Sequence, residues 1–186
     1  MNFAEPSGFE IFLTRSVSIL TCRNYRRYVE SMKLSGSENV LEYGSGSGNM
    51  SVILAKELKD GTLTCLDISE KWLETVRKRL RKFRRVNYIL GDLTELELPS
   101  GRFDVIVVHF VIHDISPTDR QARVQKLASL LKIGGRIYLK EPTRETHGIS
   151  LTEVRRLLSD VGLKEIASTE RKESPIGDVL HVVYEK

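Results

Sequence analysis

The chain has 186 residues, of which 29 are basic and 25 acidic, so its formal net charge is +4. Hydrophobic residues make up 40% of the chain and charged residues 29%, a globular balance that argues against intrinsic disorder. Two cysteines exclude a disulfide framework and a four-cysteine metal site, so we expect the reducing cytoplasm as the compartment. We expect no membrane span, because no apolar run reaches the ~18 residues that a span needs. We expect no secretory signal, because the first residues show no basic region followed by an apolar segment.

The first part of the chain is predicted to be helical. Apolar residues recur at spacings of three or four from about Phe9 to about Met32. We expect residues 1–34 to form a helical lid over the edge of the sheet that follows.

Strands and helices then alternate along the chain. The pattern predicts strands at 40–43, 62–66, 86–90, 103–108 and 136–140. It predicts helices at 49–58, at 69–85, from Pro117 to about 132, and from a Ser150-x-x-Glu153 capping box to about 161. Two final strands, 163–167 and 181–184, are separated by a charged loop without a helix, so they must be antiparallel.

This order predicts an α/β fold. We expect a Rossmann-like, doubly wound, mostly parallel sheet of seven strands with an antiparallel hairpin at its C-terminal edge. No repeat or low-complexity segment interrupts the chain, so residues 1–186 are expected to form a single domain.

A glycine-rich loop follows the first predicted strand. Its sequence is Glu42-Tyr43-Gly44-Ser45-Gly46-Ser47-Gly48. Glycines at these positions permit a tight turn and let a ligand approach the backbone closely. The G-x-G-x-x-G dinucleotide pattern fails here, and the Glu42 carboxylate would repel a pyrophosphate but attract a cation.

Further carboxylates follow the next two strands, at Asp67 and at Gly91-Asp92. An acidic side chain at the end of the second strand can accept hydrogen bonds from two ribose hydroxyls. Three carboxylates at three strand ends describe a pocket for a nucleoside that lacks phosphates and carries positive charge. S-adenosylmethionine fits that description.

The sequence resembles the class I S-adenosylmethionine-dependent methyltransferases, in particular the group that includes ubiquinone and menaquinone methyltransferases. The resemblance covers roughly Val40 to Gly162. It rests on five motifs in order, which are the glycine loop, Leu66-Asp67-Ile68-Ser69, Gly91-Asp92-Leu93, the segment Phe103–Asp114, and Leu130-Leu131-Lys132-Ile133-Gly134-Gly135. Ile133 replaces the proline that the family usually has, and Asp114 replaces the second histidine of the family's fourth motif.

The resemblance implies a set of cofactor-binding residues. Glu42 and the backbone of Gly44, Ser45, Gly46 and Gly48 would hold the methionine part. Asp67 would bind the ribose hydroxyls, Ile68 would pack on adenine, and Asp92, after Gly91, would bond the adenine amino group with the backbone of Leu93. His109 would lie near the methionine amine.

Methyl transfer needs a general base only if the acceptor loses a proton. The candidates are His113, Asp114 and Glu141, near the ends of the fourth and fifth strands, with His109 and Tyr28 as further groups. The segment His109-Phe110-Val111-Ile112 lacks the Asn/Asp-Pro-Pro-Tyr sequence common in enzymes that methylate amide or nucleobase nitrogens. We therefore expect methylation of a small-molecule acceptor, with S-adenosylhomocysteine as product and no metal.

A basic run at 77–85 leaves a second possibility open, because seven of its nine residues are Lys or Arg. It is either the solvated face of an amphipathic helix or a patch for RNA or an anionic lipid. The alternatives to small-molecule methylation are methylation of RNA, protein or lipid, and a non-catalytic S-adenosylmethionine-binding or regulatory module. A nicotinamide-dependent oxidoreductase is disfavoured by the glycine spacing and by Glu42.

Overall fold

Two groups of hydrogen-bonded strands, one in each half of the chain, organise the structure, a computed structural model that describes residues 5–7, 22–144, 147–174 and 176–186. The chain divides into two compact units, residues 1–92 and residues 93–186. The prediction of one domain over the whole chain therefore stays a prediction, and each unit is described by itself.

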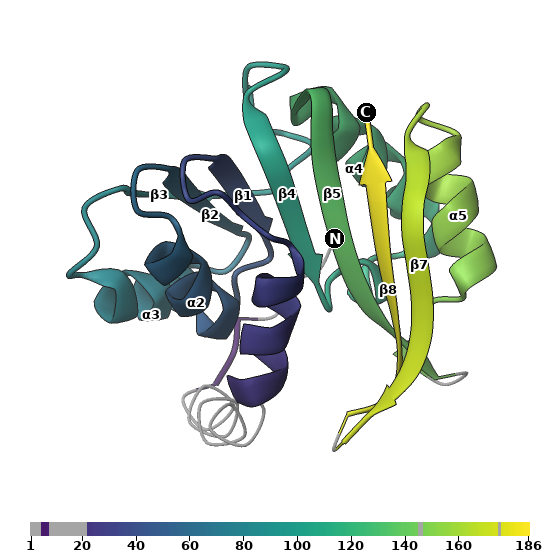
Figure 1. The fold of residues 1–186 in the computed structure, drawn as a ribbon, viewed down its shortest axis with the longest axis horizontal. Coiled ribbons are helices and arrows are strands. Elements are labelled where there is room, and N and C mark those ends of the chain that lie inside the picture. Colours follow the sequence, from purple (N-terminus) through teal and green to yellow (C-terminus); the bar gives the residue numbers. More distant parts are fainter. Residues whose placement is uncertain (1–4, 8–21, 145–146, 175) are drawn as a thin grey trace. The chain divides into compact units, whose positions relative to one another are not determined.

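The first unit contains a small parallel sheet with helices. After helical residues 22–31, the elements are β1 (Asn39–Tyr43), α2 (Asn49–Glu57), β2 (Thr62–Asp67), α3 (Glu70–Leu80) and β3 (Val86–Leu90) (Figure 1). Its strands lie in the order β3-β2-β1, with Val40 opposite Leu63 and Leu63 opposite Val86. The parallel order follows from the two helical crossovers.

The core of this unit comes from apolar strand residues and from one face of α3. Val40, Leu41 and Leu63 are buried in the sheet. Leu73 and Val76 lie three residues apart and are both buried, as is expected of an amphipathic helix. The alternation of strand and helix predicted for this part of the chain is confirmed.

The predicted helix 69–85 is too long. It ends at Leu80, where the Phe83 N–H donates to the Leu80 carbonyl at 2.8 Å. The Leu63 N–H then donates to the Arg85 carbonyl, which brings the chain alongside β2. Pairing with β2 competes with continuation of the helix, so residues 81–85 form a connection and only part of the basic run is helical.

The second unit holds a mixed sheet covered by two helices. Its elements are β4 (Phe103–His109), the 3₁₀-helix η1 (Ile112–Asp114), α4 (Pro117–Leu130), β5 (Leu131–Arg144), β6 (His147–Gly148), α5 (Leu151–Ser159), β7 (Lys164–Glu173) and β8 (Gly177–Glu185). The strand order is β4-β5-β8-β7, with β6 paired to β5. Strands β4 and β5 are parallel, whereas β8 is antiparallel to both of its neighbours.

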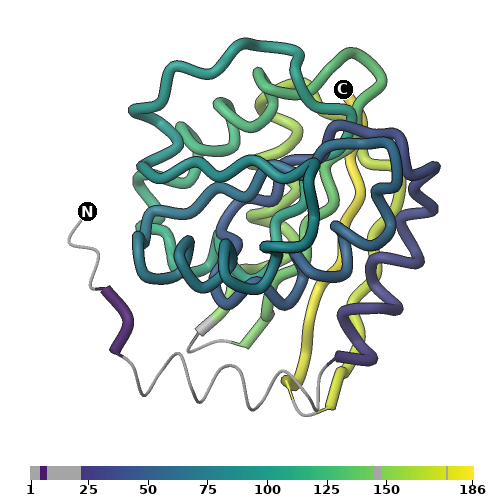
Figure 2. Tube along the Cα trace, turned by 90° about the vertical axis from the view of Figure 1, so that its left-hand side faces the viewer, coloured from purple at the N-terminus to yellow at the C-terminus, as the bar shows by residue number. Residues whose placement is uncertain are grey.

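The final hairpin is much longer than predicted. Strands β7 and β8 run side by side along their whole length in Figures 1 and 2, with pairs from Lys164–Glu185 to Glu173–Gly177. The charged segment predicted as a loop is thus mostly strand. Within this segment Glu173 pairs with His181 across the strands, and Val179 and Leu180 are buried, so polarity alone did not mark a loop.

The prediction for the N-terminus is only partly covered by the structure. Residues 22–31 are helical as predicted, and Tyr28, Val29 and Met32 are buried. Residues 1–4 and 8–21 lie outside the described residues. The lid role of residues 1–34 stays a prediction.

Candidate functional site

The glycine loop is fastened to the end of the neighbouring strand. The Gly44 N–H donates to the Leu66 carbonyl at 2.8 Å, and the Gly46 N–H donates to Asp67 Oδ2 at 2.7 Å. The other Asp67 oxygen, Oδ1, accepts from the Ser69 N–H at 3.0 Å. One carboxylate therefore joins the loop after β1 to the turn before α3.

Two glycines of the loop serve different purposes. Gly46 and Gly48 have φ angles of +47° and +75°, which favour glycine. A Cβ at Gly48 would lie 3.2 Å from Val76 Cγ2, so this position lets α3 pack closely. A Cβ at Gly46 would meet nothing within 4 Å, which leaves the backbone there open to a ligand.

Glu42 is a buried acid beside this loop. Burial raises the pKa of Glu42 to about 8, and the negative charge of Asp67 adds to the effect. Cys65 Sγ lies 3.6 Å from Glu42 Oε2. A cationic ligand next to this carboxyl would favour its ionised form, because opposite charges stabilise each other strongly away from water.

The strand-end carboxylates predicted for the ribose and the adenine lie in the same unit. Burial raises the pKa of Asp67, while the N–H donors of Ser69 and Gly46 oppose that shift. The Gly91 N–H donates to the Asp67 carbonyl at 3.1 Å, which places Asp92 beside the end of β2. Ile68, next to Asp67, is half-buried.

These residues fit S-adenosylmethionine. An open backbone at Gly46, a buried acid at Glu42 and an acceptor with spare lone pairs at Asp67 match a ligand with a cation and two ribose hydroxyls. Leu93 and His109, the other predicted cofactor residues, belong to the second unit, where Leu93 is buried. Their cofactor roles stay predictions.

The three predicted catalytic residues lie together in the second unit. His113 Nδ1 is 2.6 Å from Glu141 Oε2, and His113 Nε2 is 3.3 Å from Asp114 Oδ1. Glu141 is fully buried on β5, whereas Asp114 is exposed. The arrangement is a largely buried histidine that a carboxylate orients through one ring nitrogen while Asp114 covers the other, a pattern that a general base can use.

The backbone of η1 holds this pair in place. Glu141 Oε1 accepts from the N–H groups of Val111 at 3.0 Å and Ile112 at 2.7 Å. Burial lowers the pKa of His113, but the hydrogen bond to Glu141 and the two carboxylates outweigh it. The pKa of His113 therefore lies above its usual value.

Arg120 lies behind His113 and was not predicted from the sequence. Its Nη2 donates to the His113 carbonyl at 3.0 Å, its Nε to the Ile115 carbonyl at 2.9 Å, and its Nη1 bonds Glu153 at 2.7 Å. This buried guanidinium fixes both η1 and the start of α5. The sequence offered no signal for it, since an arginine in the first turns of a helix is usually solvated.

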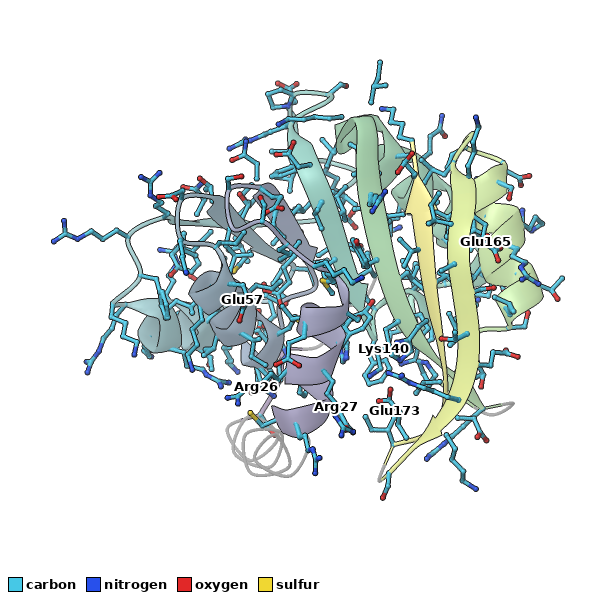
Figure 3. All side chains as sticks on the ribbon, viewed as in Figure 1. Arg26, Arg27, Glu57, Lys140, Glu165 and Glu173 are labelled. Atoms are coloured by element: carbon cyan, nitrogen blue, oxygen red, sulfur yellow. The ribbon has the colours of Figure 1, made fainter. Side chains whose placement is uncertain are left out.

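A second buried charged cluster was also missed. Lys140 on β5 and Glu173 on β7 lie together (Figure 3), with Lys140 Nζ 2.6 Å from Glu173 Oε2. On β8, His181 Nε2 lies 3.0 Å from Glu173 Oε1. Burial lowers the pKa of Lys140, and burial beside Lys140 lowers the pKa of His181 to about 4. Lys140 and Glu141 are neighbours on a strand, so their side chains point to opposite faces. The sequence did hold a signal for this cluster, because Lys140 follows apolar residues in a predicted strand and a buried lysine there needs an acidic partner.

His109, predicted near the cofactor, adjoins this second cluster. Its ring contacts that of Phe110, with 4.2 Å between ring centroids and a tilt of 46°, and Lys140 lies opposite His109 in the strand register. Burial and the nearby Lys140 charge hold the pKa of His109 well below its usual value. Phe110 has a φ of +59°, an uncommon conformation for a side chain of that size.

The side chain of Glu5, near the start of the sequence, contacts the first turn of α3. Glu5 accepts from the Ser69 hydroxyl at 2.6 Å and from the Glu70 N–H at 3.0 Å. Negative charge is favourable at a helix N-terminus, where N–H groups lack partners. Contacts between residues 64 and 65 positions apart leave no local trace in the sequence.

Two absences concern the described residues. No group of three His, Cys, Asp or Glu side chains among them could hold a metal ion. None of the helices described is both long enough and apolar enough to cross a membrane.

Comparison with known protein families shows to which family the chain belongs. The model of a family described as methyltransferase domain matches residues 40–135. The chain belongs to this methyltransferase family. The match spans the glycine loop, both strand-end carboxylates and His113, so the family resemblance inferred from the motifs is confirmed.

A curated relative of this methyltransferase domain is the ubiquinone/menaquinone biosynthesis C-methyltransferase UbiE of Shewanella halifaxensis. It is 27% identical over 132 residues, which are 68% of this chain and 52% of the relative. The chain thus spans about half the length of the curated relatives it matches.

Two solved structures share the fold. The N-methyltransferase NodS of Bradyrhizobium japonicum, in complex with S-adenosyl-L-homocysteine, has a TM-score of 0.77 at 20% identity and covers 88% of this chain and 86% of that one. The [4+2]-cyclase SpnF has the same TM-score at 14% identity and covers 89% and 81% of the two chains. The predicted Rossmann-like fold with an antiparallel C-terminal hairpin is confirmed.

Proposed function

We propose that this methyltransferase domain binds S-adenosylmethionine and transfers its methyl group to a small-molecule acceptor. The observation that carries the proposal is the grouping of buried Glu42, open Gly46 and hydrogen-bonded Asp67 around one loop. Family membership supports the activity, and the name of the Shewanella relative supports a small acceptor.

Each cofactor contact follows from the chemistry of the residue. Glu42, once ionised, attracts the cationic methionine end, and Asp67 accepts the ribose hydroxyls. Ile68 offers an apolar surface to the adenine, and Asp92 a hydrogen-bond acceptor to its amino group. When bound, S-adenosylmethionine supplies an electrophilic methyl group on a sulfonium, and S-adenosylhomocysteine is the product.

His113 is proposed as the general base toward the acceptor. Glu141 orients the ring through Nδ1 and stabilises its protonated form, so Nε2 can take a proton once the exposed Asp114 side chain moves aside. The acceptor is then one that loses a proton on methylation, such as a hydroxyl or an acidic ring carbon. Arg120 positions the base through the His113 carbonyl.

The cofactor assignment is tested by calorimetric titration with S-adenosylmethionine, S-adenosylhomocysteine and NAD in parallel. We expect the first two to bind and NAD not to bind. Asp67→Ala should weaken binding at least ~tenfold, because it removes the ribose acceptor and loosens the Gly46 turn.

Asp60→Ala is the matched control, because Asp60 is an exposed aspartate that lies just before β2, whereas Asp67 ends this strand. The Asp60→Ala variant should bind S-adenosylmethionine as tightly as the wild type. Binding of NAD alone would overturn the proposal. Unchanged affinity in Asp67→Ala would overturn the role of that residue, provided that its thermal unfolding remains cooperative.

A further inference from the structure

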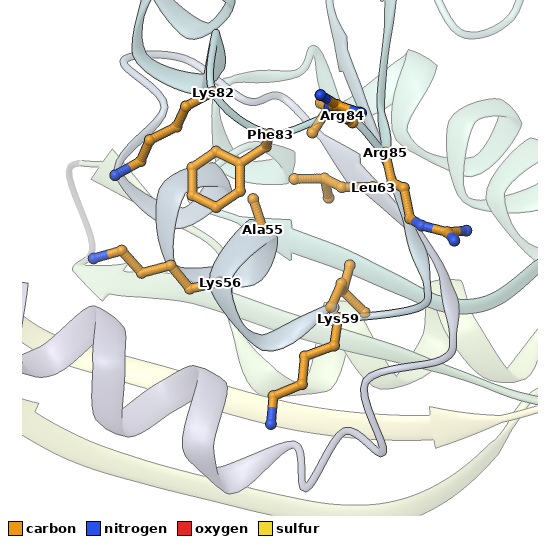
Figure 4. A pocket seen from close by; sticks show the side chains of 10 residues that line it. Ala55, Lys56, Lys59, Leu63, Lys82, Phe83, Arg84 and Arg85 are labelled. Atoms are coloured by element: carbon orange, nitrogen blue, oxygen red, sulfur yellow. The ribbon is translucent and has the colours of Figure 1, made fainter.

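A basic pocket lies in the first unit, between the end of α2, the start of β2 and the connection from α3 to β3 (Figure 4). Its volume is about 400 Å³. Five cationic residues line it, namely Lys56, Lys59, Lys82, Arg84 and Arg85, and no acidic residue does. We call this feature the basic pocket.

The cations of the basic pocket have no acidic partners among the residues that the structure describes. Within the described part of the chain, none of the five side chains forms an ion pair with a carboxylate. Arg85 donates one hydrogen bond to the Asp60 carbonyl at 3.2 Å, and Lys82 Nζ lies 5.6 Å from the centre of the Phe83 ring. Like charges around one hollow repel each other, so an anion bound there lowers this repulsion.

The inner surface of the pocket is apolar. Phe83 lies among the cations and is half-exposed, and Ala55 and Leu63 lie beneath it (Figure 4). If these cations only contacted water, an apolar cavity between them would have no role. An aromatic ring with cations around it suits a ligand that joins an anionic group to a flat or apolar body.

The basic pocket is separate from the proposed cofactor site. Leu63 and Val86 stand at the beginnings of β2 and β3, whereas Asp67 ends β2. Four residues of extended strand separate Leu63 from Asp67, roughly 13 Å at 3.3 Å per residue. A ligand in this pocket therefore cannot take part in methyl transfer at the glycine loop.

We propose that the basic pocket binds a ligand with clustered phosphate groups joined to an aromatic or apolar body. Phosphate suits a rim of Lys and Arg side chains, because its oxygens accept charge-assisted hydrogen bonds from flexible cations that can turn toward it. A soluble nucleotide and a phosphorylated lipid headgroup share this chemistry. The inference does not depend on the proposed methyltransferase activity.

The test is calorimetric binding at about 0.15 M salt, where surface attraction is screened beyond ~8 Å. The probes are ATP, inorganic tripolyphosphate, and phosphatidylcholine vesicles containing phosphatidic acid, each with saturating S-adenosylhomocysteine. The added S-adenosylhomocysteine keeps ATP out of the proposed cofactor site. We expect ATP to bind more tightly than tripolyphosphate if the source is a soluble nucleotide, and the vesicles to bind instead if it is a lipid.

Variants assign the binding to the pocket. Lys82→Gln with Arg84→Gln should weaken binding of the bound probe at least about tenfold. Lys164→Gln with Lys172→Gln removes the same charge from exposed positions on β7 and should stay within about twofold. Phe83→Leu should weaken ATP but not tripolyphosphate.

Three results would overturn the proposal. One is the absence of binding by all three probes, and another is an equal loss in the pocket and control variants. The third is tight binding of a single-stranded RNA that ATP does not displace, which would assign the basic run to RNA. Thermal unfolding of each variant shows that a loss is not due to misfolding.

Discussion

At the scale of single residues, the proposed activity depends on two buried acids that have different partners. Glu42 has only a thiol and neighbouring polar groups near it, and burial raises its pKa to about 8. Glu141 accepts two backbone N–H groups and faces His113. We expect Glu42 to pair with the cationic end of the ligand, whereas Glu141 already pairs with His113.

The raised pKa of Glu42 predicts that cofactor affinity depends on pH. A cationic ligand prefers the ionised carboxylate, whose fraction grows with pH up to about 8. The affinity for S-adenosylhomocysteine should therefore rise from pH 6 to pH 7.5, by up to about tenfold per pH unit. Calorimetry in buffers of different ionisation enthalpy should detect the proton released on binding.

Glu42→Gln is the control for this prediction. It keeps the size of the side chain but cannot ionise, so its affinity should be lower and nearly independent of pH over that range. A wild-type affinity that stays flat between pH 6 and 7.5 would contradict the assignment of Glu42 to the cationic end of the ligand.

His113 is predicted to titrate above the usual histidine range. NMR titration of the ring protons should give His113 a pKa above the reference value of ~6.5. Glu141→Gln should lower that pKa, because the amide can still accept the two N–H groups of η1 but carries no charge. The neutral ring is the base, so the rate with a competent acceptor should rise as pH rises through this pKa.

His181 offers an internal comparison for His113, because burial and the nearby Lys140 charge lower the pKa of His181 to about 4. Opposite shifts for His113 and His181 in one titration are the expected result. A His113 pKa that does not move in Glu141→Gln would refute the pairing of this histidine with Glu141.

At the scale of elements, helix starts show how local chemistry is used in this chain. Ser150 precedes α5 and accepts from the Glu153 N–H at 3.1 Å. The predicted capping box is only half formed, because the Glu153 carboxylate bonds Arg120 instead of returning to Ser150. Ser116 precedes α4 in the same position but its hydroxyl bonds Thr118, not the helix backbone.

This difference gives a paired stability prediction. Ser150→Ala should lower the free energy of unfolding by about 1 kcal/mol, because it leaves a helix N–H without its side-chain acceptor. Ser116→Ala should cost less than about 0.5 kcal/mol, since no cap is lost. Urea unfolding of the two variants measures both values, and equal losses would refute the distinction.

At the scale of the whole molecule, the net charge is unevenly distributed between the units. Residues 1–92 contain 15 basic and 11 acidic residues, whereas residues 93–186 contain 14 of each. The entire net charge of +4 thus belongs to the unit with the basic pocket. Net charge of one sign attracts counter-ions to that unit, and the pocket gives the attraction a defined place.

The sequence by itself determined the local features of this protein. The strand β1, the glycine loop after it and Asp67 at the end of β2 could be predicted because strand periodicity and turn residues act over a few positions. The fold class followed from the alternation of strands and helices. His113, Asp114 and Glu141 could be named because parallel strands bring their C-terminal ends to one edge.

Only the tertiary structure decided which distant groups meet. The contact of Glu5 with Ser69, the guanidinium of Arg120 behind His113 and the Lys140–Glu173 pair join residues 64, 7 and 33 positions apart. The end of α3 at Leu80 and the length of the β7–β8 hairpin were set by strand pairing. Pairing and burial are properties of the assembled sheet, and they override local propensity because they contribute more free energy than the preference of any short segment.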